Sequence, residues 1–268
     1  MLAPDEPDPV GHVPGDQISP FLLLCDHAGR LVPRKLGNLG APAGEFDRHT
    51  AYDIGALGVA TRLSERLGAE LIFQRYSRLV IDCNRPPHVP SAFVKRADGS
   101  PIKANQALTA TDAAARCAEI FHPYHSAIEA ALARRQASVI VAVHSFTPKH
   151  TELPGPRPWH VGLLFNRFDG LAMALQDALA SDPSLTIGMN EPYKVSDNDD
   201  YAIPVHAERT GRAHVEIEVR QDLILEAEGQ MAWGDRLADA LVAALAVMDR
   251  SNTASPVAAA KLQSGAPQ

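Results

Sequence analysis

Histidines beside apolar runs are the residues of this sequence that can best do chemistry. His27 follows the run Phe21–Cys25, and His144 follows the run at residues 138–143. Short continuous apolar runs are typical of strands that are buried on both faces. Two imidazoles at the ends of two such strands can bind a divalent metal ion, whereas one alone is as well explained as a rim residue that hydrogen-bonds the backbone. The pair therefore predicts a metal site.

Two residues are candidates for the third ligand. His49 and Asp53 are four residues apart in a segment, residues 45–67, whose apolar spacing predicts a helix, so they share one face of it. Two histidines and one carboxylate, with water at the fourth position, form a common catalytic zinc site. We expect Asp53 to be the third ligand, with His49 as second choice. A solvated helix face, or a pairing of the two as ligand and orienting partner, is the alternative.

Two glutamates lie in a predicted strand at residues 215–219. Glu216 and Glu218 point to the same face because side chains alternate along a strand. A buried acid in an apolar strand is costly unless it has a role. Beside a metal site, a carboxylate can take a proton from the attacking water and deliver it to a leaving nitrogen. Arg220 lies on the same face, so a glutamate–arginine pair is the competing explanation.

Polar residues follow another predicted strand, at residues 79–81. Asn84 and Arg85 combine a directional amide with a planar guanidinium, which suits a substrate carboxylate. Arg78, just upstream, could stabilise a developing oxyanion. For each of these arginines, an ordinary surface position is the alternative.

The elements that must position these residues alternate between strands and helices. This order predicts a three-layer α/β/α sandwich with a mixed, largely parallel sheet. In such sheets ligand sites gather at the carboxyl ends of the strands, where His27, His144 and Glu218 would meet. Strands are expected at residues 21–25, 71–73, 79–81, 138–143, 161–165 and 215–219. Helices are expected at residues 45–67, 112–136 with a kink at Pro123, 171–180 and 229–249.

Composition limits the class of protein. The 268 residues are 46% hydrophobic and favour one domain at residues 19–250, between a flexible segment at 1–18 and a disordered tail at 251–268. The net charge of −7, without a long basic run, does not favour a nucleic-acid partner. Three widely spaced cysteines do not favour a disulfide framework and fit the cytoplasm. The sequence starts without a signal-peptide pattern, and no apolar run approaches the roughly 20 residues of a membrane helix.

Histidines are common in this chain, which has 11 of them, so chance pairings are expected. We therefore expect most of the remaining ones not to bind metal: His122, His125, His150, His160, His206 and His214.

Taken together, several motifs resemble the N-formylglutamate amidohydrolase family. They are CDHAGRLVP (25–33), EFDRHTAYDIGALGVATRL (45–63), YSRLVIDCNRP (76–86), FHPYH (121–125), VAVHSFTP (141–148), NEPY (190–193), IPVHAER (203–209) and HVEIEVRQDLI (214–224). The resemblance implies a fold like that of zinc-dependent exopeptidases. It also implies hydrolysis of N-formyl-L-glutamate to formate and L-glutamate, with histidine degradation as the setting.

The resemblance also implies roles for individual residues. His27 and His144 match the zinc-binding histidines, and Glu218 matches the general base better than Glu216 does. Asn84 and Arg85 match the pair that grips the substrate carboxylate, and Arg220 is a further candidate for substrate binding.

One position departs from the relatives, which usually place a glutamate ligand three residues after the first histidine. Here that position is Arg30, so the carboxylate ligand must come from elsewhere, and we favour Asp53. The expected cofactor is one zinc ion, with another divalent metal as the alternative. The expected partner is a small-molecule substrate, and the oligomeric state stays open.

Two other functions compete with this hypothesis. The same site could hydrolyse another N-acyl amino acid or a small peptide. Alternatively, the fold could be a binding module without catalysis, and Arg30 in place of the usual glutamate favours that explanation.

Overall fold

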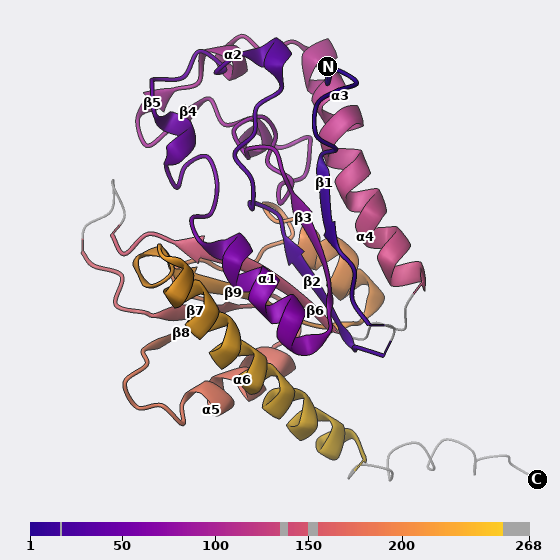
Figure 1. The fold of residues 1–268 in the computed structure, drawn as a ribbon, viewed down its shortest axis with the longest axis vertical. Helices are drawn as coiled ribbons and strands as arrows, with labels where there is room; N and C mark the ends of the chain where they lie inside the picture. Colours follow the sequence, from indigo (N-terminus) through magenta and orange to yellow (C-terminus); the bar gives the residue numbers. More distant parts are fainter. Residues whose placement is uncertain (17, 135–138, 150–154, 254–268) are drawn as a thin grey trace, which may run out of the picture.

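A mixed β-sheet forms the centre of the protein (Figure 1). The computed structural model describes residues 1–16, 18–134, 139–149 and 155–253, and in them a seven-stranded sheet has the order β1-β3-β2-β6-β9-β7-β8. The four neighbours from β3 to β9 are parallel, whereas β1 pairs antiparallel with β3 and β7 antiparallel with β9. The strands are β1 (Val10–Val13), β2 (Phe21–Cys25), β3 (Glu70–Gln74), β6 (Val139–Phe146), β7 (Val161–Leu164), β8 (Ile187–Met189) and β9 (Ala213–Arg220).

Helices cover both faces of the sheet and complete the expected three layers (Figure 1). One face packs against α1 (Ala56–Leu67), α5 (Gly170–Leu179) and α6 (Ala227–Thr253), and the other against α4 (His122–Arg134). In β2, Leu23 points into the first core and Leu24 into the second, because side chains alternate along a strand. All five residues of β2 are buried, which explains its continuous apolar sequence. The α/β/α class predicted from the sequence is confirmed.

The helix expected over residues 45–67 is wrong in its first half. Only Glu45–Asp47 forms a 3₁₀ turn there, and α1 begins at Ala56 after Gly55, whose φ is 80°. Between them, the Asp53 amide donates to the carbonyl of His27 at 2.9 Å. This bond to a distant segment replaces a helical bond, so His49 and Asp53 lie in a turn and not on a helix face.

The strand expected at residues 79–81 is also wrong, because this segment pairs with no strand. Instead, side chains donate to its carbonyls: Asn105 Nδ2 to Leu79 at 2.8 Å and Arg116 Nη1 to Val80 at 2.7 Å. Both apolar residues are fully buried against the sheet face that carries α4. Three apolar residues in a row predict burial but cannot distinguish a strand from a buried loop.

The long helix expected at residues 112–136 is divided into three parts. Thr109 is the N-cap, and its hydroxyl accepts the amide of Asp112 at 3.1 Å, so Asp112 is not the cap. After α3 (Ala110–Arg116), a π-helical segment at Cys117–Phe121 leads directly into α4. Pro123 therefore follows a π turn without interrupting the helix. The expected end near residue 136 lies outside the described residues.

The remaining elements are short. Part of the segment at residues 1–18 that we expected to be flexible is β1, paired with β3 from Val10 opposite Gln74 to Val13 opposite Leu71. Residues 254–268 of the expected tail lie outside the described residues, and α6 extends to Thr253.

No helix in the described part of the chain has the length and apolarity to cross a membrane. The other elements are β4 (Arg96–Ala97), β5 (Ser100–Pro101) and α2 (Lys103–Gln106).

Candidate metal centre and cleft

The two histidines at the strand ends lie next to each other. His27 is in the turn after β2, and His144 is in β6, directly opposite Glu218 of β9. Their ring centroids are 4.9 Å apart, and both residues are buried. Because β2 and β6 are neighbouring parallel strands, their carboxyl ends bring the two imidazoles together as the sequence indicated.

Asp53 completes a group of three ligand types. Its Oδ2 lies 2.8 Å from His144 Nδ1 and 3.4 Å from His27 Nδ1. One donor atom from each residue lies within 4.8 Å of the others. His27 Nδ1 has no hydrogen-bond partner in the described structure. Two imidazoles and a carboxylate facing one point form a donor set that fits zinc or a similar divalent ion.

His49 is not part of this group. Its Nε2 lies 3.1 Å from the Asp98 carboxylate at the wall of the cleft. His49, our second choice for the third ligand, is therefore engaged elsewhere, because the turn at residues 48–55 directs Asp53 and His49 to different partners.

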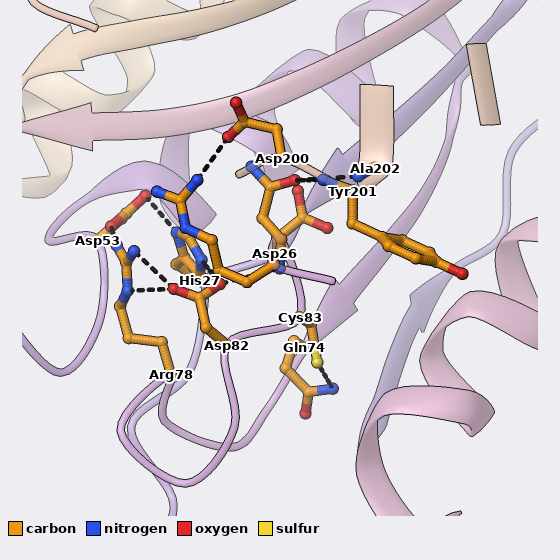
Figure 2. A network of polar contacts seen from close by, with 12 residues as sticks. Asp26, His27, Asp53, Gln74, Arg78, Asp82, Cys83, Asp200, Tyr201 and Ala202 are labelled. Carbon is orange, nitrogen blue, oxygen red and sulfur yellow. Dashed lines mark hydrogen bonds and ion pairs between the residues drawn. The ribbon is translucent and has the colours of Figure 1, made fainter. Parts of the chain in front are cut away.

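Each histidine of the group has a second aspartate behind it. Asp82 Oδ1 lies 2.7 Å from His27 Nε2, and Asp82 Oδ2 accepts two bonds from Arg78 at 3.0 and 2.7 Å (Figure 2). On the other side, Asp26 Oδ2 lies 3.3 Å from His144 Nε2. A hydrogen-bonded carboxylate such as Asp82 fixes the tautomer and orientation of a metal-binding imidazole, whereas Asp26 and His144 form an ion pair without a hydrogen bond in the described structure. Sequence reasoning assigned no role to Asp26 or Asp82, although both lie inside the motifs at residues 25–33 and 76–86.

Charge interactions dominate the protonation of this cluster. Burial alone would raise the pKa of Asp53, but His27 and His144 outweigh it and lower that pKa. Burial opposes protonation of His144, yet the charges of Glu216, Asp26 and Asp53 raise its pKa well above the ordinary value. A cluster that holds excess negative charge around two imidazoles is suited to a cation.

The two glutamates of β9 face the same cleft. Burial raises the pKa of Glu216 to about 7, and it raises the pKa of Glu218 well above its ordinary value, while His144 opposes both shifts. Opposite Glu218, β7 carries Gly162, where a Cβ atom would lie 2.1 Å from the carbonyl oxygen of Glu191. Glycine is therefore required beside Glu218. A glutamate with a raised pKa at such a site can both accept and return a proton.

A cleft of about 530 Å³ opens over this group. Arg85 reaches into it, with Nη1 donating to Asp200 Oδ1 at 2.8 Å and to the Asp199 carbonyl at 2.6 Å. Asn84 Oδ1 accepts the backbone amides of residues 201 and 202 at 3.1 and 3.0 Å. The cleft brings together most of the residues that the sequence singled out: His27, Asp53, Arg78, Asn84, Arg85, His144, Glu216 and Glu218.

Two arginines lie away from this group. Arg220 is not among the residues that line the cleft, and its guanidinium binds Asp222 at 2.7 Å. Arg220 is the last residue of β9, and its guanidinium also donates to the carbonyls of Pro158 and Trp159, which lie outside the cleft. Arg30 pairs with exposed Asp47 and does not reach the histidines.

The fold and the site define an α/β protein with a buried two-histidine, one-aspartate centre at the carboxyl ends of its parallel strands. The chain belongs to the N-formylglutamate amidohydrolase family, whose sequence model matches residues 19–225. This membership supports a hydrolase that acts on an amide bond.

Two solved structures share the fold of this chain. The chain is 35% identical to a gene product of Agrobacterium tumefaciens, with a TM-score of 0.87 over 92% of this chain and 99% of that one. It is 18% identical to an N-formylglutamate amidohydrolase from Ralstonia eutropha JMP134, with a TM-score of 0.71 over 91% of this chain and 99% of that one; this likeness shows the fold. A search of curated proteins returned no match.

Proposed function

We propose that this protein is a metal-dependent amidohydrolase that cleaves N-formyl-L-glutamate to formate and L-glutamate. The observation that carries the proposal is the buried His27, Asp53 and His144 group with Glu218 directly opposite His144 in the sheet. These three residues would hold one zinc ion. When bound, a divalent ion supplies Lewis acidity, which polarises the acyl carbonyl and lowers the pKa of water.

Glu218 is the proposed general base and acid. It takes a proton from the attacking water while the new bond forms between the water oxygen and the formyl carbon. It then gives that proton to the nitrogen as the carbon–nitrogen bond breaks, so that the leaving group is a neutral amine. Its raised pKa and its place in the cleft support this role.

Arginines orient the substrate and stabilise its developing charge. Arg78 is held by two bonds to Asp82, so its guanidinium is preorganised to face an oxyanion. Arg85 uses Nη1 for the protein, which leaves Nη2 and Nε for a substrate carboxylate, with Asn84 beside it. Such local positive charge is needed because the protein has a net charge of −7.

One observation favours a second candidate function. A cleft of about 530 Å³ is within the range, about 300–1,000 Å³, that holds a drug-sized ligand, so it has room for a longer acyl group or a small peptide. A substrate panel at fixed zinc compares N-formylglutamate, longer N-acyl glutamates and dipeptides. Peptides hydrolysed far faster than N-formylglutamate would favour this candidate.

The remaining parts of the proposal concern the cell compartment, the pathway and the non-catalytic alternative. Cys25, Cys83 and Cys117 are free thiols, which supports a reducing cytoplasm. Histidine degradation is the natural setting of formylglutamate and follows only from the proposed substrate. A non-catalytic binding module is disfavoured, because Arg30 lies away from a histidine–aspartate group that is complete without it.

The test is a Glu218→Gln enzyme loaded with zinc and assayed for formate release. We expect kcat to fall by about 10²- to 10⁴-fold, since one proton-transfer group is removed. Glu226→Gln, at an exposed position outside the cleft, is the matched control and keeps full activity. Near-normal turnover by Glu218→Gln would contradict the proposal.

A further inference from the structure

A tyrosine at the cleft has a hydroxyl proton with no acceptor among the residues that the structure describes. Tyr193 lines the cleft and is 45% exposed, and Arg157 Nη1 donates to its Oη at 3.0 Å. A guanidinium has only donors, so the tyrosine oxygen is the acceptor in this bond and its own proton stays available. None of the described residues accepts that proton. The hydroxyl can therefore donate this proton to a ligand bound in the cleft.

Arg157 holds this tyrosine firmly. Its Nη1 also donates to the Thr147 hydroxyl at 3.2 Å, and its guanidinium lies 4.9 Å from the Tyr193 ring centroid and 5.9 Å from that of Phe146. Stacking on two rings favours the cation. Arg157 is only 9% exposed, and no carboxylate in the described part of the chain pairs with it. A buried cation therefore lies next to the tyrosine hydroxyl and strengthens it as a donor to a negatively charged oxygen.

Tyr193 lines the same cleft as Glu218 and Arg78. Besides Arg157, the charges that act on it are those of Glu218 and Arg78, the two residues assigned to proton transfer and oxyanion stabilisation. Burial chiefly raises the pKa of Tyr193, Glu218 adds to the effect, and the two arginines oppose it. The hydroxyl is thus protonated at neutral pH and able to donate.

We propose that Tyr193 is a catalytic residue that donates a hydrogen bond to the acyl oxygen of the substrate, and that Arg157 is a positioning residue that acts through it. The inference rests on the function proposed above and adds a second donor beside Arg78. The tyrosine keeps its proton throughout: the hydrogen bond only strengthens as negative charge develops on the acyl oxygen.

The first test compares Tyr193→Phe with the intact enzyme on N-formylglutamate. Removing one oxyanion donor costs about 10²- to 10³-fold in kcat, so we expect a fall of about 100-fold with KM changed less than about threefold. L-glutamate lacks the formyl group, so we expect its affinity, measured by calorimetry, to be the same in both proteins. Tyr52→Phe is the matched control, because Tyr52 does not line this cleft. A kcat within threefold, or weaker glutamate binding at unchanged kcat, overturns the proposal.

The second test asks whether Arg157 acts through Tyr193. Arg157→Met is expected to lower kcat by about tenfold in the native background and by less than about twofold in the Tyr193→Phe background, since residues that act together are not additive. Arg157→Lys keeps the charge and restores part of the loss. Equal effects of Arg157→Met in both backgrounds overturn the positioning role, and thermal melting curves identify any variant that is merely unfolded.

The same experiments separate failure of this inference from failure of the proposed function. An intact enzyme that cleaves N-formylglutamate, with an unaffected Tyr193→Phe variant, contradicts the inference alone. An intact enzyme that cleaves only another N-acyl amide contradicts the proposed substrate, and the kcat and KM measurements then test Tyr193 on that amide. An enzyme that hydrolyses no amide contradicts both.

Discussion

Two pairs of buried histidines lie in the described part of the chain, and they differ in what surrounds them. The rings of His27 and His144 are 4.9 Å apart, and those of His125 and His206 are 5.1 Å apart. In the second pair, His125 Nδ1 and His206 Nε2 are hydrogen-bonded to each other at 2.9 Å, and His125 Nε2 donates to the Cys83 carbonyl at 2.9 Å. In the first pair, the ring nitrogens face aspartates: those of His27 face Asp82 and Asp53, and those of His144 face Asp53 and Asp26.

The surroundings give the two pairs opposite protonation behaviour. Burial, with the His206 charge adding to it, lowers the pKa of His125 to about 3, and burial lowers that of His206 to about 4. By contrast, carboxylates raise the pKa of His27 and His144 despite their burial. Closeness of two imidazoles therefore does not define a metal site; the arrangement of carboxylates around them does.

The largest expected difference between the pairs is in zinc affinity. Replacing His27 or His144 by alanine removes a ligand, so we expect a loss larger than the roughly 10- to 100-fold that an orienting residue contributes. His206→Ala, in the other pair, is expected to change zinc affinity by less than about threefold. Competition with a chromogenic chelator measures the zinc affinity of each variant. Equal losses of affinity in the two pairs would contradict the difference proposed between them.

A smaller difference is expected between the two orienting aspartates. Asp82→Asn should weaken zinc binding by about 10- to 100-fold, and Asp26→Asn by less. The reason is that His27 lies in a turn and depends on side chains for its orientation, whereas His144 is fixed in β6 between β2 and β9. The same chelator assay ranks the two variants, and the reverse order would show that strand pairing does not orient His144.

The smallest expected effect is on stability as a function of pH in the metal-free protein. Because the folded pKa values of His125 and His206 lie below the unfolded value of about 6.5, the unfolded chain binds more protons between about pH 6.5 and 4. The free energy of unfolding contributed by this pair therefore falls as the pH falls through that window.

Urea unfolding across the window tests this sign. A His125→Gln/His206→Gln double variant lacks the two titrating groups, so its stability should decline less steeply than that of the native chain. His27 and His144 act oppositely: their raised pKa values give stability that is present below about pH 6.5 and lost as the pH rises through the folded values. Parallel curves for the native chain and the double variant would contradict the assignment.

Sequence patterns predicted the elements whose side chains are buried in a regular pattern. Residues 21–25 are apolar throughout because β2 is covered on both faces, and the strand could be recognised from that alone. The turn at residues 48–55 could not, since its shape comes from bonds such as that between the Asp53 amide and the His27 carbonyl, 26 positions away. Residues 79–81 show the same limit, because burial without a partner strand leaves the same apolar pattern.

Some residues of the site could be found from the sequence in the same way, and others could not. His27 and His144 could be found because each lies at the end of an apolar strand, and the sheet then brings the ends together. Asp26 and Asp82 lie within the motifs at residues 25–33 and 76–86, but their roles depend on which nitrogen of each imidazole they face. Tyr193 ends the NEPY motif, but it lies in an irregular loop where no periodicity operates, so the sequence assigns it no role and the bond from Arg157 is what indicates one.

The most direct measurement is X-ray absorption spectroscopy of the purified chain reconstituted with zinc, with metal content determined in parallel. We predict one zinc ion per chain, bound at about 2.0–2.2 Å by two imidazole nitrogens and a carboxylate oxygen, with the imidazole signal lost in a His27→Ala/His144→Ala variant and kept in His206→Ala. A chain that takes up no zinc, or one whose zinc signal survives loss of His27 and His144, would contradict the central claim.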